Sequence, residues 1–243
     1  MPGHPIELSV IMPAFNEGLE IHGSIRAVDQ KLAAMNVPYE IIIVNDGSRD
    51  DTLAKAQTCA CGHIKILSYG QRRGKGFAVR HGMIHAQGKY KLFMDVDLST
   101  SLDAVDHFLP RMRDEKYDLL IGDRKSSPGN QGTKQPWHRR FLGDGFIKLS
   151  RLCVGRNIKD FTCGFKMFNA AAADILFSRQ RTFNWAFDTE LIYIALLHRL
   201  RIGEIPVVWN HHQGSAVRPI RDIFTSLTGL WTIKWHALKG AYR

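Results

Sequence analysis

Short apolar runs alternate with helix-like patterns through most of this chain, and this alternation restricts its fold more than any other feature. Residues 41–44 read Ile-Ile-Ile-Val, a run typical of a parallel strand that is buried on both faces. Because strands and helices alternate at this spacing, we expect right-handed βαβ units on a parallel sheet. Strands are predicted at 7–12, 39–44, 64–68, 90–94, 118–121 and 204–209. Helices are predicted to begin near 16 and 50 and to span 74–86, 103–112, 140–152 and 187–200.

The composition is that of a folded, basic protein. The 243 residues are 44% hydrophobic and 23% charged, which suffices for one large domain or two small ones. With 33 Lys and Arg against 23 Asp and Glu, the net charge is +10. A surplus of this sign implies an anionic partner, such as nucleotide phosphate, nucleic acid or an acidic membrane surface. No recognisable nucleic-acid-binding motif occurs, so nucleic acid is not expected as a partner.

The chain shows no pattern for export or for crossing a membrane. Residues 1–5 lack a basic stretch followed by an apolar run, and no window approaches the roughly 18 consecutive apolar residues of a spanning helix. The cysteines lack zinc-finger spacing and are expected to be reduced thiols in the cytoplasm; they are Cys59, Cys61, Cys153 and Cys163. The segment 125–136 is rich in Gly, Pro and polar residues, which is typical of a loop that covers a site or of disorder.

Two carboxylates follow the predicted strand at 90–94. Asp95 and Asp97 are separated by one residue, so in an extended backbone both side chains point the same way. Ligands of open α/β sheets bind at the carboxyl ends of the strands. Paired carboxylates at that place suit a hard divalent cation that also holds a phosphate oxygen. Turns are rich in Asp as well, so the pair alone is also compatible with a plain turn.

Three further features suit nucleotide binding. Arg72, Arg73 and Lys75 lie in a glycine-bounded loop at a predicted helix start, where backbone N–H groups and cations can hold a pyrophosphate. A solvated basic loop is the alternative. Asp46 ends a predicted strand, where it either accepts hydrogen bonds from a base or ribose or stabilises the Asp-Gly-Ser turn. Glu17 either lies beside the nucleotide or is an ordinary acid of a first helical turn.

A set of motifs, taken in order, resembles those of the family 2 glycosyltransferases. The first half of the chain contains Pro13-Ala14-Phe15-Asn16-Glu17, Val44-Asn45-Asp46-Gly47-Ser48, Gly74-Lys75-Gly76 and Asp95-Val96-Asp97-Leu98-Ser99. The second half contains Ile121-Gly122-Asp123-Arg124, Asp160-Phe161-Thr162-Cys163-Gly164-Phe165-Lys166-Met167-Phe168 and Phe187-Asp188-Thr189-Glu190-Leu191. The second set is similar to that of the polyprenyl-phosphate sugar transferases, closest to dolichyl-phosphate glucosyltransferases and dolichyl-phosphate mannosyltransferases. The resemblance spans residues 6–218.

The resemblance implies a GT-A fold, a Rossmann-like α/β fold whose mixed, mainly parallel sheet is flanked by helices. It implies a nucleotide-binding role for Pro13, Phe15, Glu17, Asp46, Lys75 and Asp95. It also implies Mg²⁺ or Mn²⁺ bound by Asp95 and Asp97, with Asp97 the main ligand and a catalytic residue. The ion would neutralise charge on the nucleoside-diphosphate leaving group, which is Lewis-acid catalysis. Ser99 occupies the position of a minor third ligand.

In the second half, the resemblance implies groups for the acceptor and the sugar. Arg124 is implied to be catalytic and to face the acceptor phosphate, and an ion pair with Asp123 or another carboxylate is the alternative. Asp160 is assigned to sugar hydroxyls or to loop scaffolding. Asp188 and Glu190 are assigned to sugar binding or site organisation, and Asp188 is also counted as catalytic. Trp185 is either a stacking surface for a sugar or isoprenoid, or a core residue.

A departure from the family pattern lies near the end of the expected GT-A domain, 1–218. The family often has Gly-Ser-Lys there, whereas this chain reads Gly214-Ser215-Ala216-Val217-Arg218. Without the lysine, Arg218 is expected to supply the positive charge. Ser215 and Arg218 are therefore assigned to acceptor or diphosphate binding.

The segment 219–243 is expected to form an amphipathic helix. Apolar side chains recur at helical spacing with basic residues beside them: Ile220, Ile223, Phe224, Leu227, Leu230, Trp231, Trp235 and Leu238, flanked by Lys234, Lys239 and Arg243. The pattern suits a helix at a membrane interface, a helix docked on the core, or a dimer contact. The positive charge favours an anionic surface, so we expect a cytoplasmic protein held peripherally on the cytoplasmic face of a membrane, with a homo-oligomer or membrane partner possible.

Together these implications describe an inverting enzyme that moves a hexose from a nucleotide sugar to a polyprenyl or dolichyl phosphate. UDP-glucose is the expected donor, and GDP-mannose or UDP-N-acetylhexosamine are alternatives. A phosphate acceptor needs no general base, because its second pKa is about 6. Two other functions stay open. One is transfer to a hydroxyl with Asp188 or Glu190 as base, and the other is a non-catalytic nucleotide-sugar-binding subunit.

Overall fold

One mixed sheet of seven strands organises the computed structural model, which describes residues 6–114, 116–127, 137–155, 158–210 and 219–243. The strands are β1 (Leu8–Ala14), β2 (Tyr39–Asn45), β3 (Ile64–Ser68), β4 (Tyr90–Met94), β5 (Leu119–Asp123), β6 (Phe165–Asn169) and β7 (Ile202–Pro206). Their order across the sheet is β3-β2-β1-β4-β6-β5-β7. β6 runs antiparallel to both of its neighbours, and all other pairs are parallel.

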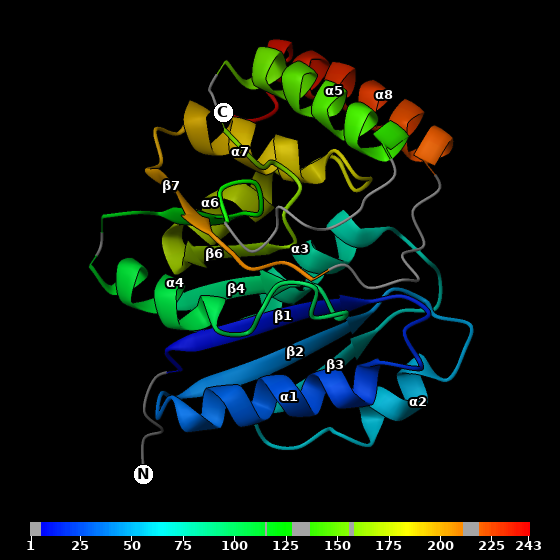
Figure 1. The fold of residues 1–243 in the computed structure, drawn as a ribbon, viewed down its shortest axis with the longest axis vertical. Helices are drawn as coiled ribbons and strands as arrows, with labels where there is room; N and C mark the ends of the chain where they lie inside the picture. Colours follow the sequence, from blue (N-terminus) through cyan, green and yellow to red (C-terminus); the bar gives the residue numbers. More distant parts are fainter. Residues whose placement is uncertain (1–5, 115, 128–136, 156–157, 211–218) are drawn as a thin grey trace.

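Helices cover both faces of the sheet (Figure 1). Those of the first half are α1 (Ile21–Ala34), α2 (Thr52–Gln57), α3 (Lys75–His85) and α4 (Ala104–Arg113). Those of the second half are α5 (Trp137–Val154), α6 (Ala170–Arg179), α7 (Phe187–Leu197) and α8 (Pro219–Leu238). Residues of α1 and α4 share one hydrophobic core, and residues of α3, α6 and α7 share the other.

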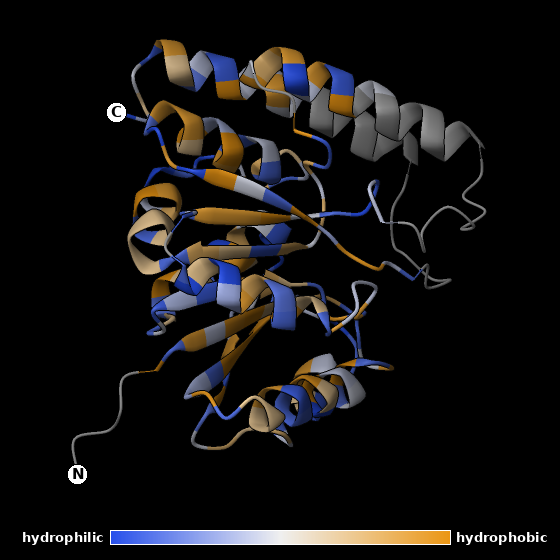
Figure 2. Ribbon diagram, turned by 60° about the vertical axis from the view of Figure 1, so that its left-hand side comes forward, coloured by the Kyte–Doolittle hydropathy of each residue, from blue (hydrophilic) through white to orange (hydrophobic). Residues whose placement is uncertain are grey.

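The uninterrupted apolar strands follow from this two-sided burial. Neighbouring strand residues point to opposite faces, so Val10 and Ile41 pack in one core while Ile11 and Ile42 pack in the other. All four side chains are fully buried. In Figure 2 the strands are coloured largely as hydrophobic, whereas the covering helices mix hydrophobic and hydrophilic residues.

The predicted mixed, mainly parallel sheet is confirmed, with three corrections in detail. The helix expected near 16 begins at Ile21, because Asn16 has a left-handed backbone with φ 56°. The last strand lies at Ile202–Pro206 rather than 204–209, and Trp209, outside that strand, forms an isolated β-bridge with Thr100. β6 and α6 were not predicted as elements, and β6 departs from the expected parallel arrangement. The larger part of the expected covering loop, residues 128–136, lies outside the described residues.

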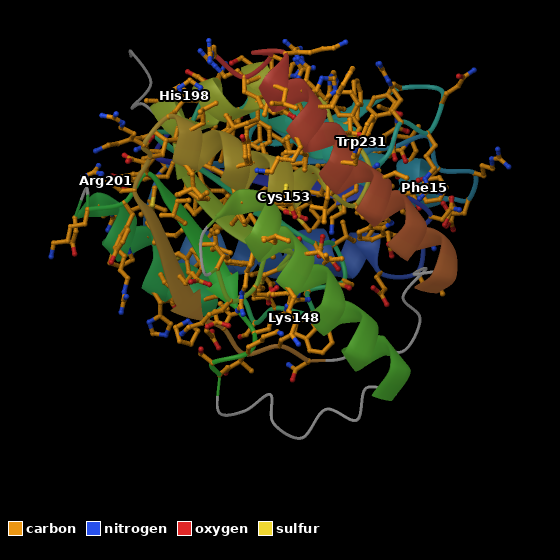
Figure 3. All side chains as sticks on the ribbon, turned by 90° about the horizontal axis from the view of Figure 1, so that it is seen from above. Phe15, Lys148, Cys153, His198, Arg201 and Trp231 are labelled. Atoms are coloured by element: carbon orange, nitrogen blue, oxygen red, sulfur yellow. The ribbon has the colours of Figure 1, made fainter. Side chains whose placement is uncertain are left out.

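α8 lies beside α5 on the outside of the molecule, as the view from above shows (Figure 3). Leu230 and Ile233 of α8 are buried, whereas Trp231 is 67% exposed and Leu238 is 83% exposed. The prediction of one apolar stripe that includes Leu230, Trp231 and Leu238 is therefore wrong, because the first packs inward and the other two point outward. The side chains of residues 219–227 lie outside the described part. No helix within the described ranges is long and apolar enough to cross a membrane.

Candidate active site

The carboxyl ends of β1, β2 and β4 meet at one edge of the sheet, and each leads into a predicted site residue. Phe15 follows β1, Asp46 follows β2 and Asp95 follows β4. β1 lies between β2 and β4. The chain runs from β1 to β2 and β3 on one side of β1, and then crosses to β4 on the other side. Open α/β sheets form a ligand crevice at such a switch point. Phe15 marks this side of the molecule in Figure 3, opposite Arg201.

Asp95 is held beside a lysine and against a glycine. Its Oδ1 lies 2.6 Å from Lys75 Nζ, and the two side chains are 33% and 25% exposed. The Asp95 backbone N–H donates to the carbonyl of Gly164 at 3.2 Å. A Cβ atom at position 164 would overlap the Asp95 carboxylate, so only glycine allows this approach. The structure thus joins Asp95 to two of the predicted motifs.

Negative charge is concentrated around the two predicted metal ligands. Asp97 Oδ1 accepts a hydrogen bond from the backbone N–H of Ser99 at 2.9 Å, and the Ser99 residue is buried. Burial, followed by the nearby carboxylates of Glu20, Asp97, Asp95 and Asp50, raises the pKa of Glu17 to about 7. Burial is the larger cause of this raised pKa, and the four neighbouring carboxylates add to it, so several negative charges lie close to Glu17.

This charge distribution fits a bound cation. Asp95 and Asp97 offer oxygen ligands of the type that Mg²⁺ and Mn²⁺ prefer. The raised pKa of Glu17 would fall if a divalent cation neutralised them. Among the residues that the structure describes, no three His, Cys, Asp or Glu side chains form a ready-made ligand set. Donor phosphates or water would therefore have to complete the coordination.

Asp46 ties the basic loop to the end of β2. Its Oδ1 accepts hydrogen bonds from the Tyr69 hydroxyl at 2.9 Å and from the Arg73 backbone N–H at 2.7 Å. Its Oδ2 accepts from the Gly74 backbone N–H at 2.9 Å. Gly74 has φ 98°, a conformation that glycine adopts without strain. These contacts give Asp46 a role in holding the loop, and its contact with a base or ribose stays a prediction.

Two arginines of this loop stack on aromatic rings at the same edge. The Arg72 guanidinium lies 3.9 Å from the centre of the Phe15 ring, and that of Arg73 lies 3.6 Å from the Phe77 ring. Glu17 is held through its backbone N–H, which donates to Thr52 Oγ1 at 2.8 Å. The loop therefore presents flat, positively charged groups where a nucleotide is expected.

Pro13 lies within β1, and its neighbour in the parallel register is Val44 of β2. Its side chain is half-buried next to the buried end of the strand. The nucleotide-binding roles of Pro13, Phe15 and Glu17 stay predictions, although all three lie at the same edge as Asp46 and Asp95.

Arg124 and Asp160 form a two-point ion pair after β5. Arg124 Nε donates to Asp160 Oδ2 at 2.6 Å, and a terminal nitrogen donates to Oδ1 at 2.7 Å. The same nitrogen donates to Thr162 Oγ1 at 2.9 Å. Although burial opposes ionisation, the Arg124 guanidinium holds the pKa of Asp160 below its usual value.

This ion pair is relevant to two questions that the sequence left open, namely the carboxylate partner of Arg124 and the role of Asp160. The carboxylate partner of Arg124 is Asp160, not the adjacent Asp123. Asp123 accepts instead from the backbone N–H of Lys125 at 2.9 Å. Asp160 is 1% exposed and both of its oxygens are bound by Arg124, which agrees with the scaffolding alternative. Contact between Asp160 and a sugar, and between Arg124 and an acceptor phosphate, stay predictions.

Asp188, in the first turn of α7, is paired with a lysine that the motif analysis did not single out. Lys166 of β6 is fully buried, and its Nζ lies 2.5 Å from Asp188 Oδ1. The same nitrogen donates to the Cys163 carbonyl at 2.6 Å. Burial raises the pKa of Asp188, while the charges of Lys166 and Lys75 oppose that rise. A buried charge needs such a partner, so Lys166 keeps Asp188 in place.

Glu190 lies in the same first turn of α7 and organises a loop. It is fully buried and accepts hydrogen bonds from the Thr182 backbone N–H at 2.8 Å and the Tyr242 hydroxyl at 2.6 Å. It also accepts from the backbone N–H of Arg181 at 3.1 Å. These partners match the site-organising alternative, and direct sugar binding by Glu190 stays a prediction.

Two of the predicted residues lie outside the described part of the chain, and two other residues were missed. Ser215 and Arg218 lie outside the described residues, so their roles stay predictions. Lys166 was missed as a functional residue, although a lysine inside the apolar stretch Phe165-Lys166-Met167-Phe168 is a signal for a buried charge. No sequence signal points to Tyr242, because its partner Glu190 lies 52 residues earlier in the chain.

Comparisons with known proteins identify the family of the chain. Residues 9–177 match the family model described as glycosyl transferase family 2. The chain is 34% identical to dolichyl-phosphate beta-glucosyltransferase of Drosophila melanogaster, over 94% of this chain and 78% of that protein. It is 32% identical to the enzyme of that name from Saccharomyces cerevisiae, over 98% and 77%, and 29% identical to the human one, over 98% and 78%.

Solved structures show the same fold. Glucosyl-3-phosphoglycerate synthase from Mycobacterium tuberculosis, crystallised with Mn²⁺, UDP and glucosyl-3-phosphoglycerate, superposes with a TM-score of 0.65. The match covers 94% of this chain and 80% of that chain at 17% identity, so it shows the fold alone. A second structure of that synthase, with Mn²⁺ and UDP-glucose, gives a TM-score of 0.64. The predicted GT-A fold is confirmed.

The chain belongs to glycosyltransferase family 2. It is therefore an enzyme that transfers sugar, and the alternative of a non-catalytic binding subunit is not supported. The resemblance to dolichyl-phosphate glucosyltransferases predicted from the motifs is also confirmed.

Proposed function

We propose that this enzyme transfers glucose from UDP-glucose to dolichyl phosphate or another polyprenyl phosphate, with inversion at the anomeric carbon. The named relatives support the sugar and the acceptor, since they are dolichyl-phosphate beta-glucosyltransferases aligned over most of the chain. The solved structures that share the fold support the donor and the metal, because they contain Mn²⁺ with UDP or UDP-glucose. GDP-mannose and UDP-N-acetylhexosamine are the donors to be compared.

The donor site lies at the ends of β1, β2 and β4. Asp95 and Asp97 would hold Mg²⁺ or Mn²⁺, which supplies Lewis-acid stabilisation of charge on the departing diphosphate. Lys75, 2.6 Å from Asp95, contributes a second positive charge at the same place. Arg72, stacked on Phe15, offers a cation beside the nucleotide. Asp46 keeps this basic loop in place through the Arg73 and Gly74 backbone.

The observation that supports a phosphate acceptor is that both carboxylates of α7 already have partners within the protein. Asp188 is paired with Lys166 inside the protein, and Glu190 accepts four groups from the loop and the C-terminus. A hydroxyl acceptor needs a general base within hydrogen-bond reach. A phosphate monoester needs none, because it is already anionic at neutral pH. The hydroxyl-acceptor alternative is therefore not favoured.

The acceptor phosphate is assigned to Arg124. Its side chain is 28% exposed, and Asp160 fixes the plane of the guanidinium through two hydrogen bonds. An arginine held in this way is preorganised for a phosphate oxygen. Ser215 and Arg218 are proposed to add to acceptor or diphosphate binding.

The outer surface of α5 and α8 is proposed to lie on an anionic membrane, on its cytoplasmic face. We call this the α5/α8 surface. It carries exposed apolar side chains, namely Leu149, Leu152, Trp231, Trp235 and Leu238, and exposed cations, namely Lys148, Lys234 and Lys239. Tryptophan and lysine together suit the headgroup region of a bilayer. In a flotation assay the protein should float with vesicles that contain phosphatidylserine. Much less protein should float with neutral vesicles.

A transfer assay tests the proposed reaction. The purified chain is incubated with Mn²⁺, a polyprenyl phosphate, and UDP-glucose, GDP-mannose or UDP-N-acetylglucosamine in parallel. We expect lipid-linked glucose from the first donor and at least tenfold less product from the others. Folded protein that forms no lipid-linked sugar from any donor contradicts the proposal. Product from a polyprenol, which lacks the phosphate, would support the hydroxyl-acceptor alternative instead.

A further inference from the structure

Trp185 is an exposed aromatic residue at the rim of the donor site. It lies in the loop that leads into α7, and it is 38% exposed although Ala186 and Phe187, which follow it, are fully buried. Lys75 Nζ lies 5.5 Å from the centre of the Trp185 ring and 2.6 Å from Asp95 Oδ1. The ring and the carboxylate therefore both lie within 5.5 Å of one ammonium group.

The loop that carries Trp185 is fixed to α3 on one side. The Gly76 backbone N–H donates to the Phe183 carbonyl at 3.1 Å. The Gln180 side-chain amide donates to the Gly76 carbonyl at 3.1 Å and to the Thr182 carbonyl at 2.9 Å. Because Gly76 is next to Lys75, these bonds hold the Trp185 loop beside the Lys75 backbone, and Asp95 holds the Lys75 ammonium group.

The same loop is fixed to the C-terminal segment on its other side. Glu190 binds the backbone of Thr182 and accepts the Tyr242 hydroxyl. Gly229 of α8 packs against Ala186 so closely that a Cβ atom there would overlap its side chain. Because this loop is held from both sides, little conformational entropy is lost when a ligand binds to its exposed tryptophan.

We propose that Trp185 is the surface on which the hexose of the donor packs, an inference that rests on the proposed function. A hexose is bonded directly to the diphosphate, so with the diphosphate at Lys75 and Asp95 the sugar must lie beside Lys75. The carbon-bound hydrogens of a pyranose form an apolar face, which packs on an indole ring. Trp185 thereby contributes to recognition of the sugar and not of the nucleotide.

The test separates the sugar from the nucleotide. Titration calorimetry in Mn²⁺ gives dissociation constants for UDP and UDP-glucose with the wild type, Trp185→Phe, Trp185→Ala and the control Trp231→Ala. We expect Trp185→Ala to weaken UDP-glucose about tenfold and UDP less than twofold, because only the sugar loses its contact. Trp185→Phe should keep most of the affinity, and Trp231→Ala, on the α5/α8 surface, should change neither constant. Melting temperatures check that each variant is folded.

Three results would overturn the inference. Equal weakening of UDP and UDP-glucose in Trp185→Ala would mean that the ring only supports the loop. Unchanged affinity for both ligands would mean that it makes no contact. In either case the proposed function stands if the wild type transfers glucose. A wild type that binds neither UDP nor UDP-glucose would remove the proposed donor and the role of Trp185 with it.

Discussion

The two halves of the candidate site differ in how far their charged side chains are exposed to solvent. At the ends of β1, β2 and β4, Asp95 and Lys75 remain 33% and 25% exposed. After β5 and in α7, the Asp160 side chain is 2% exposed and that of Lys166 is fully buried. Both halves therefore pair their charges, but the carboxylate of the first half stays partly exposed to a ligand, whereas the paired carboxylates of the second half, Asp160 and Asp188, are buried. A ligand-binding function is expected to respond to changes in the first half, and folding stability to changes in the second.

The largest effect is expected from breaking the buried pair. Lys166→Met leaves the Asp188 carboxylate buried without its partner, which should lower the free energy of unfolding by about 3–5 kcal/mol. The double variant Lys166→Met/Asp188→Leu removes both charges and should recover most of that loss. Urea unfolding measures both values. A single variant as stable as the wild type would mean that the pair is not a structural element of the second half.

The next effect is expected on activity in the first half. Asp97→Asn removes one negative charge from the proposed metal site, so kcat/KM for glucose transfer should fall by roughly 100-fold or more. Stability should change by less than about 1 kcal/mol. The matched control is Asp174→Asn, because that side chain is 76% exposed on α6. Equal activity of Asp97→Asn and the control would remove Asp97 from the catalytic residues.

A pH-dependent effect is expected from Glu17. Its pKa is raised from 4.5 to about 7 in the folded protein, so the folded state binds a proton more tightly than the unfolded chain. The protein should therefore lose stability as the pH rises from 4.5 to 7, by up to about 2 kcal/mol after allowance for solvent screening. Glu17→Gln should flatten that slope in urea unfolding. An identical slope in both proteins would contradict the raised pKa of Glu17.

The smallest effect is expected from the link between the C-terminus and α7. Tyr242→Phe removes one of the groups that bind Glu190 and should lower stability by about 1–2 kcal/mol. Tyr193→Phe is the control, because Tyr193 also lies on the second half of the protein, next to Tyr242. Thermal unfolding compares the two. A larger loss in the control would mean that the Tyr242 hydroxyl does not hold the loop.

The sequence predicted the first half of the site better than the second. Asp46, Lys75, Asp95 and Asp97 each follow a strand or begin a helix, so their place at one edge follows from βαβ topology alone. Even there, the partners were not predicted. The hydrogen bonds of Asp46 to Tyr69 and Gly74 depend on how the basic loop folds back, which no local pattern encodes.

In the second half, the important contacts join residues far apart in the chain. Arg124 and Asp160 are 36 residues apart, and Lys166 and Asp188 are 22 apart. β6, which carries Lys166, was not predicted because it interrupts the expected parallel order. On α8, helical periodicity placed Leu230 and Trp231 on one apolar stripe, although only packing against the rest of the protein decides which of them is buried.

The central claim is that Asp95 and Asp97 hold a divalent cation together with the donor diphosphate. A crystal structure with Mn²⁺ and UDP, recorded with anomalous scattering from manganese, tests it directly. We predict one anomalous peak bound by Asp95 or Asp97 oxygens and by UDP phosphate oxygens. UDP bound elsewhere, or bound at this edge with manganese away from both carboxylates, would contradict the account.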